Sequence, residues 1–455
     1  MRRKQRTLVV PVAKPQPASG ARAGSSRVSA IAEADEALLD RLQRGAFAYI
    51  LRYANPANGL IADTSRAGSP CSIAVVGFAL SSYIVAVERG WLSREAAAER
   101  VLVTLRFFLR SVQGDSPAGS GYKGFYYHFL DMQSGERVWR CELSLIDSTL
   151  LVAGFLSVGL YFDRPGEAEI REVADALYAR VDWRWAQNEA ASLSQGWLPE
   201  FGFLHYGWEG YNEALILYIL ALGSATHPLL PNAFATWTVT YQWERVFGQD
   251  VLYSGPLFTH FFSHAWIDFR GIRDAFMREK RSDYFQNTCR TVELQREYCE
   301  RNPRQNPGYG RDIWGISAGD GPSGEGVREF ATDRRHFGYM ARGVPFGPDD
   351  GTLCPWAMLA TLPFTPAAAL DGTRLLLKTF PQTCSEDRFA SGFNPGVDPD
   401  KGGWVSEGWY GLDQGLLVMM IENGRSGLLW SLLRESAIVR RGLRRAGFSD
   451  GWLSR

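Results

Sequence analysis

The sequence predicts an all-α protein built as a single large domain, and three observations support this prediction. Apolar residues recur with a helical period along nearly the whole chain. Beyond residue 30, no low-complexity linker separates the periodic segments. No repeat of fixed period is visible, which argues against a solenoid. The expected helices are 34–53, 71–89, 94–112, 142–162, 167–182, 211–224, 232–246, 256–278, 281–301, 352–361, 366–379, 411–423 and 426–439.

Composition narrows the class of partner. Of 455 residues, 45% are hydrophobic, which is ample for a sizeable core. The 49 basic residues balance the 49 acidic ones, and no basic stripe suggests nucleic acid or an anionic membrane surface. No charge-free apolar run of about 18 residues is present, so we expect no membrane span. The 15 tryptophans suit either an aromatic core or a surface that stacks flat ligands such as sugar rings.

The first 30 residues predict a disordered N-terminal tail rather than an export signal. The basic start, Met1–Arg6, resembles the beginning of a signal peptide. The apolar run that follows, Leu8–Ala13, is too short for one and contains Pro11. Proline, alanine, glycine and serine are frequent in the rest of the segment, which is typical of disorder.

The sequence contains only weak matches to the motifs of metal-binding and nucleotide-binding sites. His260 and His264 have the spacing of a helical metal pair, but the first histidine is not followed by the glutamate of a metallopeptidase helix. We therefore interpret them as structural. The six cysteines include no CxxC pair, so common zinc patterns are excluded, while buried thiols and disulfides both stay open. The glycine-rich segment 314–326 lacks the ending of a phosphate-binding loop.

One apolar helix begins with acidic residues. The segment from Ala214 to Gly223 is apolar all round, as a buried helix would be. Glu209 and Glu213 precede it, together with Trp208. An acid in a first turn interacts favourably with the helix dipole, by a few tenths to about 1 kcal/mol. Helix capping is therefore one explanation, and a polar pocket at the helix end is the other.

A second apolar helix repeats the pattern. Glu142 stands at its entrance and Asp147 inside it. Unpaired carboxylates are costly in an apolar core, so two such helices suggest a shared cavity. Positions five apart lie about 140° around a helix, so both acids share a face only if Glu142 precedes the regular helix. Otherwise Asp147 supports the site from the side.

Four long segments rich in Gly, Trp, Tyr and Asp are further candidates for functional loops: 117–141, 183–210, 303–351 and 384–410.

These stretches resemble the glycoamylase-like domain family, which contains the bacterial β-1,2-glucanases of glycoside hydrolase family 144. A related domain occurs in cyclic β-1,2-glucan synthases. Five segments carry the resemblance in the family's order: Gly59-Leu-Ile-Ala-Asp-Thr-Ser65, Glu142-Leu-Ser-Leu-Ile-Asp147, Trp208-Glu-Gly-Tyr-Asn-Glu-Ala214, Asp350-Gly-Thr-Leu-Cys-Pro355 and Gly411-Leu-Asp-Gln-Gly-Leu-Leu-Val-Met-Met-Ile-Glu-Asn423.

The resemblance implies an (α/α)6 toroid, a double ring of helices, formed by a catalytic domain over residues 31–455. It implies Glu142 as general acid and Glu213 as base or nucleophile, because glycoside cleavage needs one protonated and one ionised carboxyl. The expected supporting or substrate-binding residues are Asp147, Glu209, Trp208, Tyr211, Trp314, Trp409 and Asp413.

The function that follows is cleavage of β-1,2-glucan by a glycoside hydrolase, with inversion favoured. A retaining transglycosylase and a non-catalytic carbohydrate-binding toroid are the alternatives. Because two carboxyls suffice for this chemistry, we expect no metal and no cofactor. The expected partner is an oligosaccharide or polysaccharide. The resemblance implies a periplasmic or secreted protein, whereas the lack of a convincing signal peptide keeps a cytoplasmic location open.

Overall fold

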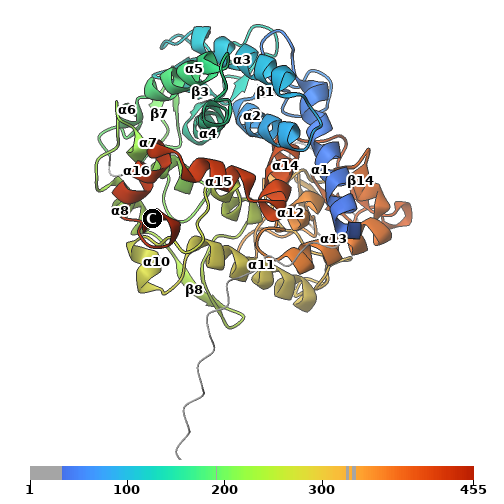
Figure 1. Cartoon of the computed structure of the whole chain (residues 1–455). Helices are drawn as coiled ribbons and strands as arrows, with labels where there is room; N and C mark the ends of the chain where they lie inside the picture. The colour runs from blue at the N-terminus through green and yellow to red at the C-terminus, as the bar shows by residue number, and fades with distance from the viewer. Residues whose placement is uncertain (1–32, 191, 324–326, 330–334, 455) are drawn as a thin grey trace, which may run out of the picture.

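Helices dominate the architecture (Figure 1). The computed structural model describes residues 33–190, 192–323, 327–329 and 335–454, so the predicted tail 1–30 lies outside the described residues. The helices are α1 (Glu33–Tyr53), α2 (Ile73–Glu88), α3 (Arg94–Arg110), α4 (Leu145–Tyr161), α5 (Ala168–Ala179), α6 (Trp183–Ala186), α7 (Leu215–Gly223), α8 (Ala233–Thr238), α9 (Phe262–Trp266), α10 (Ala275–Glu279), α11 (Tyr284–Arg301), α12 (Pro355–Leu359), α13 (Pro366–Thr379), α14 (Gly411–Arg425), α15 (Leu428–Arg434) and α16 (Ala437–Arg445).

Helices that are apolar all round form the centre. Nearly every residue of α2, α4 and α7 is buried, because these sequences offer no polar face to solvent. The crossing of α2 and α4 is close enough to require glycine. A Cβ at Gly77 would lie 2.2 Å from the Leu150 carbonyl oxygen, and one at Gly154 would lie 2.5 Å from that of Gly77. These two glycines therefore set the distance between the two helices.

The central helices contact one another in sequence around the molecule. Helix α14 contacts α2, α2 contacts α4, α4 contacts α7, α7 contacts α9, and α9 contacts α14 again. A second set packs outside them: α1 on α14, α3 on α2, α5 on α4, and α16 on α7 (Figure 1). The outer helices α1, α3 and α5 are amphipathic, with buried apolar faces and exposed charged ones.

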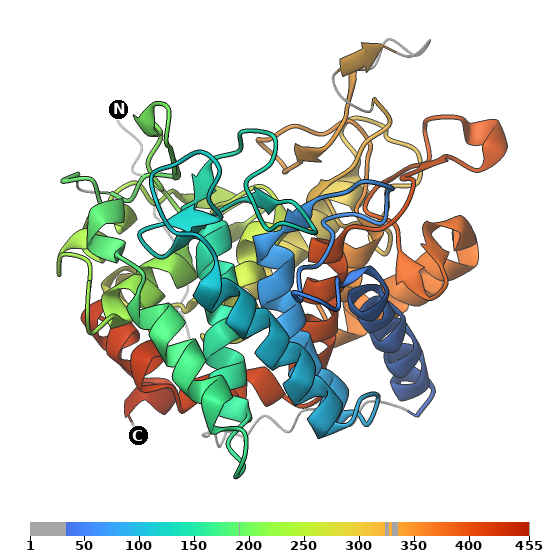
Figure 2. The same ribbon diagram turned by 90° about the horizontal axis from the view of Figure 1, so that it is seen from above.

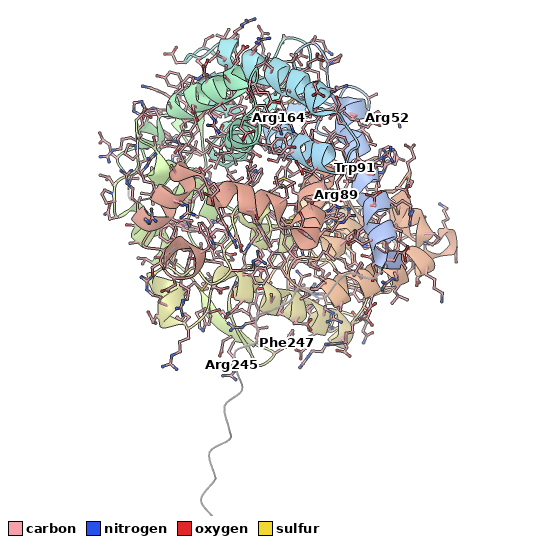
Figure 3. All side chains as sticks on the ribbon, viewed as in Figure 1. Arg52, Arg89, Trp91, Arg164, Arg245 and Phe247 are labelled. Carbon is pink, nitrogen blue, oxygen red and sulfur yellow. The ribbon has the colours of Figure 1, made fainter. Side chains whose placement is uncertain are left out.

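A largely buried ion pair joins two central helices at the end where α2 finishes. Arg89, which caps α2 and is labelled in Figure 3, donates to both carboxylate oxygens of Glu422 in α14, at 2.8 and 2.9 Å. Gln43 of α1 also donates to Glu422, at 3.1 Å. These contacts connect one outer helix to two inner ones.

Short strands accompany the helices, and the all-α prediction did not include them. The described strands are β1 (Cys71–Ser72), β2 (Gly121–Tyr122), β3 (Phe125–Tyr127), β4 (Phe129–Leu130), β5 (Leu143–Ser144), β6 (Gly196–Leu198), β7 (Gly202–Phe203), β8 (Trp243–Val246), β9 (Gln249–Leu252), β10 (Ala318–Gly319), β11 (Val327–Glu329), β12 (Arg335–Phe337), β13 (Met340–Ala341), β14 (Cys384–Ser385), β15 (Arg388–Phe389), β16 (Phe393–Asn394) and β17 (Trp404–Val405). All named pairs are antiparallel, and the largest sheet has the order β2-β3-β5-β6-β7.

Many of the strands and long loops gather at one end of the helices (Figure 2). Strand β1 leads directly into α2, and β5 leads directly into α4. The sheet register pairs Tyr127 with Leu143, which brings the ends of these strands beside the start of α4. The sheet therefore positions the residues that precede two of the central helices.

Three predicted helices differ most from the observed elements. The expected helix 232–246 stops at Thr238, and its last four residues form β8, which pairs with β9 in a hairpin. The expected helix 256–278 divides into a 3₁₀ turn (Leu257–His260), α9 and α10. The expected helix 426–439 divides into α15 and α16, where Ser436 caps the second helix by accepting from Val439 N.

A contiguous cluster of buried apolar side chains contains residues from Leu39 to Leu453. All six cysteines are unpaired thiols. Within the described ranges, no helix combines the length and apolar character that crossing a membrane requires.

Candidate active site

A cavity of about 760 Å³ lies where four central helices begin. Its lining includes Ser72 before α2, Ser144 before α4, Glu213 before α7 and Tyr410 before α14. The N-terminus of a helix carries a partial positive charge and free N–H groups. The four helix N-termini around this cavity therefore provide N–H groups and positive potential that attract carboxyl groups.

Glu213 lines the cavity immediately before α7. Its carbonyl oxygen accepts a hydrogen bond from Ser263 Oγ at 3.1 Å, which fixes the main chain at this point. Removal of the side chain from bulk water raises the pKa of Glu213 to about 7, and the charge of Asp147 acts in the same direction. The carboxyl is therefore protonated in a large fraction of molecules at neutral pH.

Glu142 lines the same cavity under different electrostatic conditions. It stands before β5 and outside the regular helix, and its Oε1 lies 2.8 Å from His128 Nδ1. Burial alone would raise the pKa of Glu142, but the hydrogen bond and charge of His128 outweigh it and lower the pKa. Glu142 is therefore ionised at neutral pH, in contrast to Glu213.

His128 lies between two carboxyl groups. Its second ring nitrogen, Nε2, lies 3.6 Å from Asp147 Oδ2. Burial disfavours the charged imidazole, but Asp147 and Glu142 prevail and raise the pKa of His128 to about 9. The ring is therefore a cation at neutral pH.

Asp147 belongs to the first turn of α4 and also lines the cavity. Ser144 Oγ accepts from Asp147 N at 3.2 Å and donates to Asp147 Oδ2 at 2.5 Å. This reciprocal cap holds the aspartate in place. The structure thus resolves the spacing of Glu142 and Asp147: the first precedes the helix, the second opens it, and both reach one cavity.

The predicted aromatic residues fall into two groups. Trp208 lines the cavity. Tyr211 and Trp314 are only 6% and 1% exposed, so neither ring offers an open face to a sugar, which argues against a substrate-binding role for either residue. Tyr211 packs instead on His260, and Trp409 lies under the guanidinium of Arg388.

Two predicted acidic residues lie away from the cavity lining. Glu209 is exposed and lines a separate small cavity with Tyr211. Asp413 is buried in the first turn of α14, where burial raises its pKa well above the usual range. The histidines 260 and 264 are fully buried, with Nε2 of each facing Ser254 O and Thr288 Oγ1, respectively.

Several cavity residues were not singled out in the sequence. Asp63 lies in a segment that carries the family resemblance, and burial raises its pKa to about 6. His128 and Trp139 lie in the long loop 117–141, and Trp139 is 69% exposed at the cavity. The composition of that loop was the available signal, but it identified no single residue.

A polar and aromatic wall completes the cavity. Arg66 donates to Asp320 Oδ2 at 2.5 Å and to the Tyr410 hydroxyl at 3.1 Å. Tyr339 stacks on Tyr410, with ring centroids 5.6 Å apart and an interplanar angle of 24°. Both tyrosines and Arg66 line the cavity. Together with Trp139 and Trp208, they offer aromatic faces and hydrogen-bonding groups beside the carboxyls, which suits a sugar ligand.

Comparison with known proteins gives consistent matches. A family model described as "Glycoamylase: Putative glucoamylase" matches residues 205–437, just over half of the chain. An exo-β-1,2-glucooligosaccharide sophorohydrolase (non-reducing end) of Parabacteroides distasonis is 26% identical over 448 residues. The match covers 90% of this chain and 58% of that relative, so the chain spans well under two thirds of the relative's length.

Solved structures with similar folds belong to proteins of the same kind. A structure from Bacteroides uniformis, described as a "putative glucoamylase", has a TM-score of 0.81 and 27% identity, covering 92% of this chain and 98% of that chain. A β-1,2-glucanase from Parabacteroides distasonis has a TM-score of 0.79 and 25% identity, covering 91% of this chain and 60% of that one. With the family model and these matches, the chain belongs to the glycoamylase-like family.

Proposed function

We propose that this chain is a glycoside hydrolase that cleaves β-1,2-glucan, with Glu213 as general acid and Glu142 as the ionised partner. One observation carries the proposal: two glutamates line one cavity, and their pKa values are displaced in opposite directions. Pairs of carboxyls with such divergent environments are typical of acid and base roles in glycoside hydrolysis.

The order of roles is the reverse of the order that the resemblance implies. A general acid has to be protonated near the working pH, and the raised pKa of Glu213 meets this need. Glu142, held beside the cationic His128, is a poor proton donor at neutral pH and a suitable base. Asp147 supports both roles, because its charge favours the protonated form of Glu213 and the cationic form of His128.

The reaction then proceeds with a balanced transfer of protons. Glu213 gives its proton to the glycosidic oxygen as the bond between that oxygen and the anomeric carbon breaks. Glu142 takes a proton from the water that attacks the anomeric carbon from the opposite face. The aromatic faces of Trp139, Trp208 and Tyr339 are the proposed supports for the sugar rings.

The substrate proposal rests on the relatives. The sophorohydrolase and the β-1,2-glucanase of P. distasonis are both named for β-1,2-linked glucose chains. The test is incubation of the purified chain with linear β-1,2-glucan and, in parallel, with starch, because the family description names a glucoamylase. We expect sugar products from β-1,2-glucan alone. Binding of β-1,2-glucan without products would instead favour the non-catalytic alternative.

The proposed fold is an (α/α)6 toroid within a catalytic domain over residues 31–455. The contacts of α2, α4, α7, α9 and α14 support an inner ring, to which α12 adds through its contact with α14. The outer positions of α1, α3, α5, α13 and α16 are consistent with a second ring. In such a toroid the cavity lies at the N-terminal end of the inner helices.

Inversion at the anomeric carbon is the proposed stereochemistry. If water attacks directly, hydrolysis of a β-linkage releases the α-anomer first. Proton NMR of the products during the first minutes, before mutarotation, measures this. Initial release of the β-anomer, together with longer glucans at high substrate concentration, would instead assign Glu142 as a nucleophile in a retaining transglycosylase.

The pH dependence of kcat/KM provides a further check. Glu213 acts only when protonated, so the rate should fall as the pH rises through about 7. Glu142 acts only when ionised, and its pKa is lowered by His128, so the fall of the rate on the acid side should lie below the usual range of a glutamate pKa. A rate that stays constant from pH 7 to pH 9 would contradict the assignment of Glu213 as the acid.

A further inference from the structure

His128 is held by the main chain as well as by its ring. Its backbone N–H donates to the Glu142 carbonyl at 3.0 Å, and its own carbonyl accepts from Ile73 N, the first residue of α2, at 3.2 Å. The ring stacks on Phe129, with centroids 4.0 Å apart and planes 13° apart. The imidazole is therefore fixed between α2, α4 and β5 before any substrate enters.

Both ring nitrogens face carboxylate oxygens, Nδ1 that of Glu142 at 2.8 Å and Nε2 that of Asp147 at 3.6 Å. A neutral imidazole donates from one nitrogen only, whereas the cation donates from both. Asp63 is the third acidic group that acts on this ring. A carboxylate beside each ring nitrogen therefore stabilises the doubly protonated ring relative to the neutral one.

Other cations near Glu142 already have partners. The charge of Arg137 also lowers the pKa of Glu142. Its guanidinium donates to Glu200 at 2.8 Å and to the carbonyls of Arg140 and Cys141 at 2.7 and 2.6 Å. His128 is thus the cationic group in hydrogen-bond contact with the Glu142 carboxylate.

We propose that His128 is a positioning residue whose doubly protonated ring bridges Glu142 and Asp147 and keeps the Glu142 carboxylate oriented and ionised to act as the base. This inference rests on the proposed function for its kinetic consequence, but not for the state of the ring. The His128 cation also links the two acids of the helix α4 entrance into one unit, so Asp147 acts on the reaction through His128 as well as through Glu213.

The His128→Gln variant tests the kinetic consequence. Glutamine can hydrogen-bond to Glu142 but carries no charge, so burial then determines the pKa of Glu142 and raises it. We expect the acid limb of the kcat/KM profile to move up by at least about one pH unit, which lowers kcat/KM about tenfold or more at a pH below both limbs, with KM changed much less than kcat. The exposed His205, outside the cavity lining, provides the matched control His205→Gln, which should retain the wild-type profile.

A second measurement does not depend on activity. Nitrogen-15 NMR of the histidine side chains, assigned with the His128→Gln and His205→Gln variants, reports the protonation of each ring. We expect the His128 ring in the wild-type chain to remain doubly protonated at pH 7.5. In Glu142→Gln, the pKa of His128 should be lower than in the wild-type chain.

The outcomes separate the two claims. A His128 ring that is neutral at pH 7.5, or an acid limb that His128→Gln leaves in place, would overturn the positioning role. A chain that shows the expected ring titration but cleaves no β-1,2-glucan would overturn the proposed function and retain the bridge between the two carboxylates. If His128→Gln does not fold, the wild-type titration still decides the state of the ring.

Discussion

Replacing Glu213 with glutamine should lower turnover on β-1,2-glucan by at least about a hundredfold, the scale of loss for a positioned acid–base group. The glutamine side chain keeps the size and hydrogen-bonding reach of glutamate, but it cannot transfer a proton to the glycosidic oxygen. Glu213 lines the cavity, and its raised pKa keeps it protonated near neutral pH. The loss should therefore appear in kcat more than in KM.

The same variant should be no less stable than the wild-type chain at pH 8. The folded-state pKa of Glu213 lies above its unfolded value, so ionisation costs stability as the pH rises from about 4.3 towards 7. Glutamine removes that cost. A helix-capping role predicts the opposite, a loss of up to about 1 kcal/mol with turnover nearly intact. Melting temperature and turnover, measured together at pH 8, distinguish the two roles.

Glu209 provides the control for this experiment. It lies four residues earlier in the same segment but is exposed and does not line the main cavity. Glu209→Gln should therefore retain turnover within about twofold, as expected for a surface substitution away from the site. Equal losses in Glu209→Gln and Glu213→Gln would indicate a general effect on the segment and would remove the support for Glu213 as the acid.

The central helices and the shared cavity could be predicted because they leave a clear pattern in the sequence. Segments such as Leu145–Tyr161 and Leu215–Gly223 are apolar on every face, so they had to be buried. Acids at the entrances of two such helices suggested a common polar surface, with helix capping as the alternative, and the structure places Glu142 and Glu213 at one cavity.

The short strands could not be predicted in the same way. Strands β1 and β5 contain two residues each, which is too few for a period of two to be recognised. They form because the chain pairs with segments far along the sequence, as Leu143 does with Trp197. The hairpin over residues 243–252 likewise replaced the end of the predicted helix 232–246 through cross-strand pairing.

Single site residues depended on tertiary contacts. His128 is the clearest case, since its role depends on the placement of Glu142 and Asp147 around its ring. Trp314 illustrates the reverse error: a tryptophan in a glycine-rich loop resembled a sugar platform, but its ring is in the core. Which face of an aromatic residue remains open is decided by packing and cannot be read from residue type.

A motif that carries the family resemblance can also be structural. Asp350 begins the segment Asp350–Pro355, yet its carboxylate faces a buried arginine and not the main cavity. Arg342 donates to Asp350 through Nε at 2.7 Å and through a terminal nitrogen at 3.0 Å. The side chains of both residues are 0% exposed. Asp350 also accepts from the backbone N–H groups of Phe337 and Thr352, which anchors the segment that carries Tyr339 to the cavity.

Replacing Asp350 with asparagine should therefore destabilise the fold by about 3–5 kcal/mol, because it leaves the Arg342 charge buried without a counter-ion. Chemical denaturation at neutral pH measures this loss. Asp371→Asn is the control, since Asp371 forms an ion pair with Arg374 at the surface and should cost less than about 1 kcal/mol. Adding Arg342→Met to Asp350→Asn should recover part of the stability by removing the unpaired charge. Equal denaturation midpoints for Asp350→Asn and Asp371→Asn would contradict the structural role, whereas a large difference would support it.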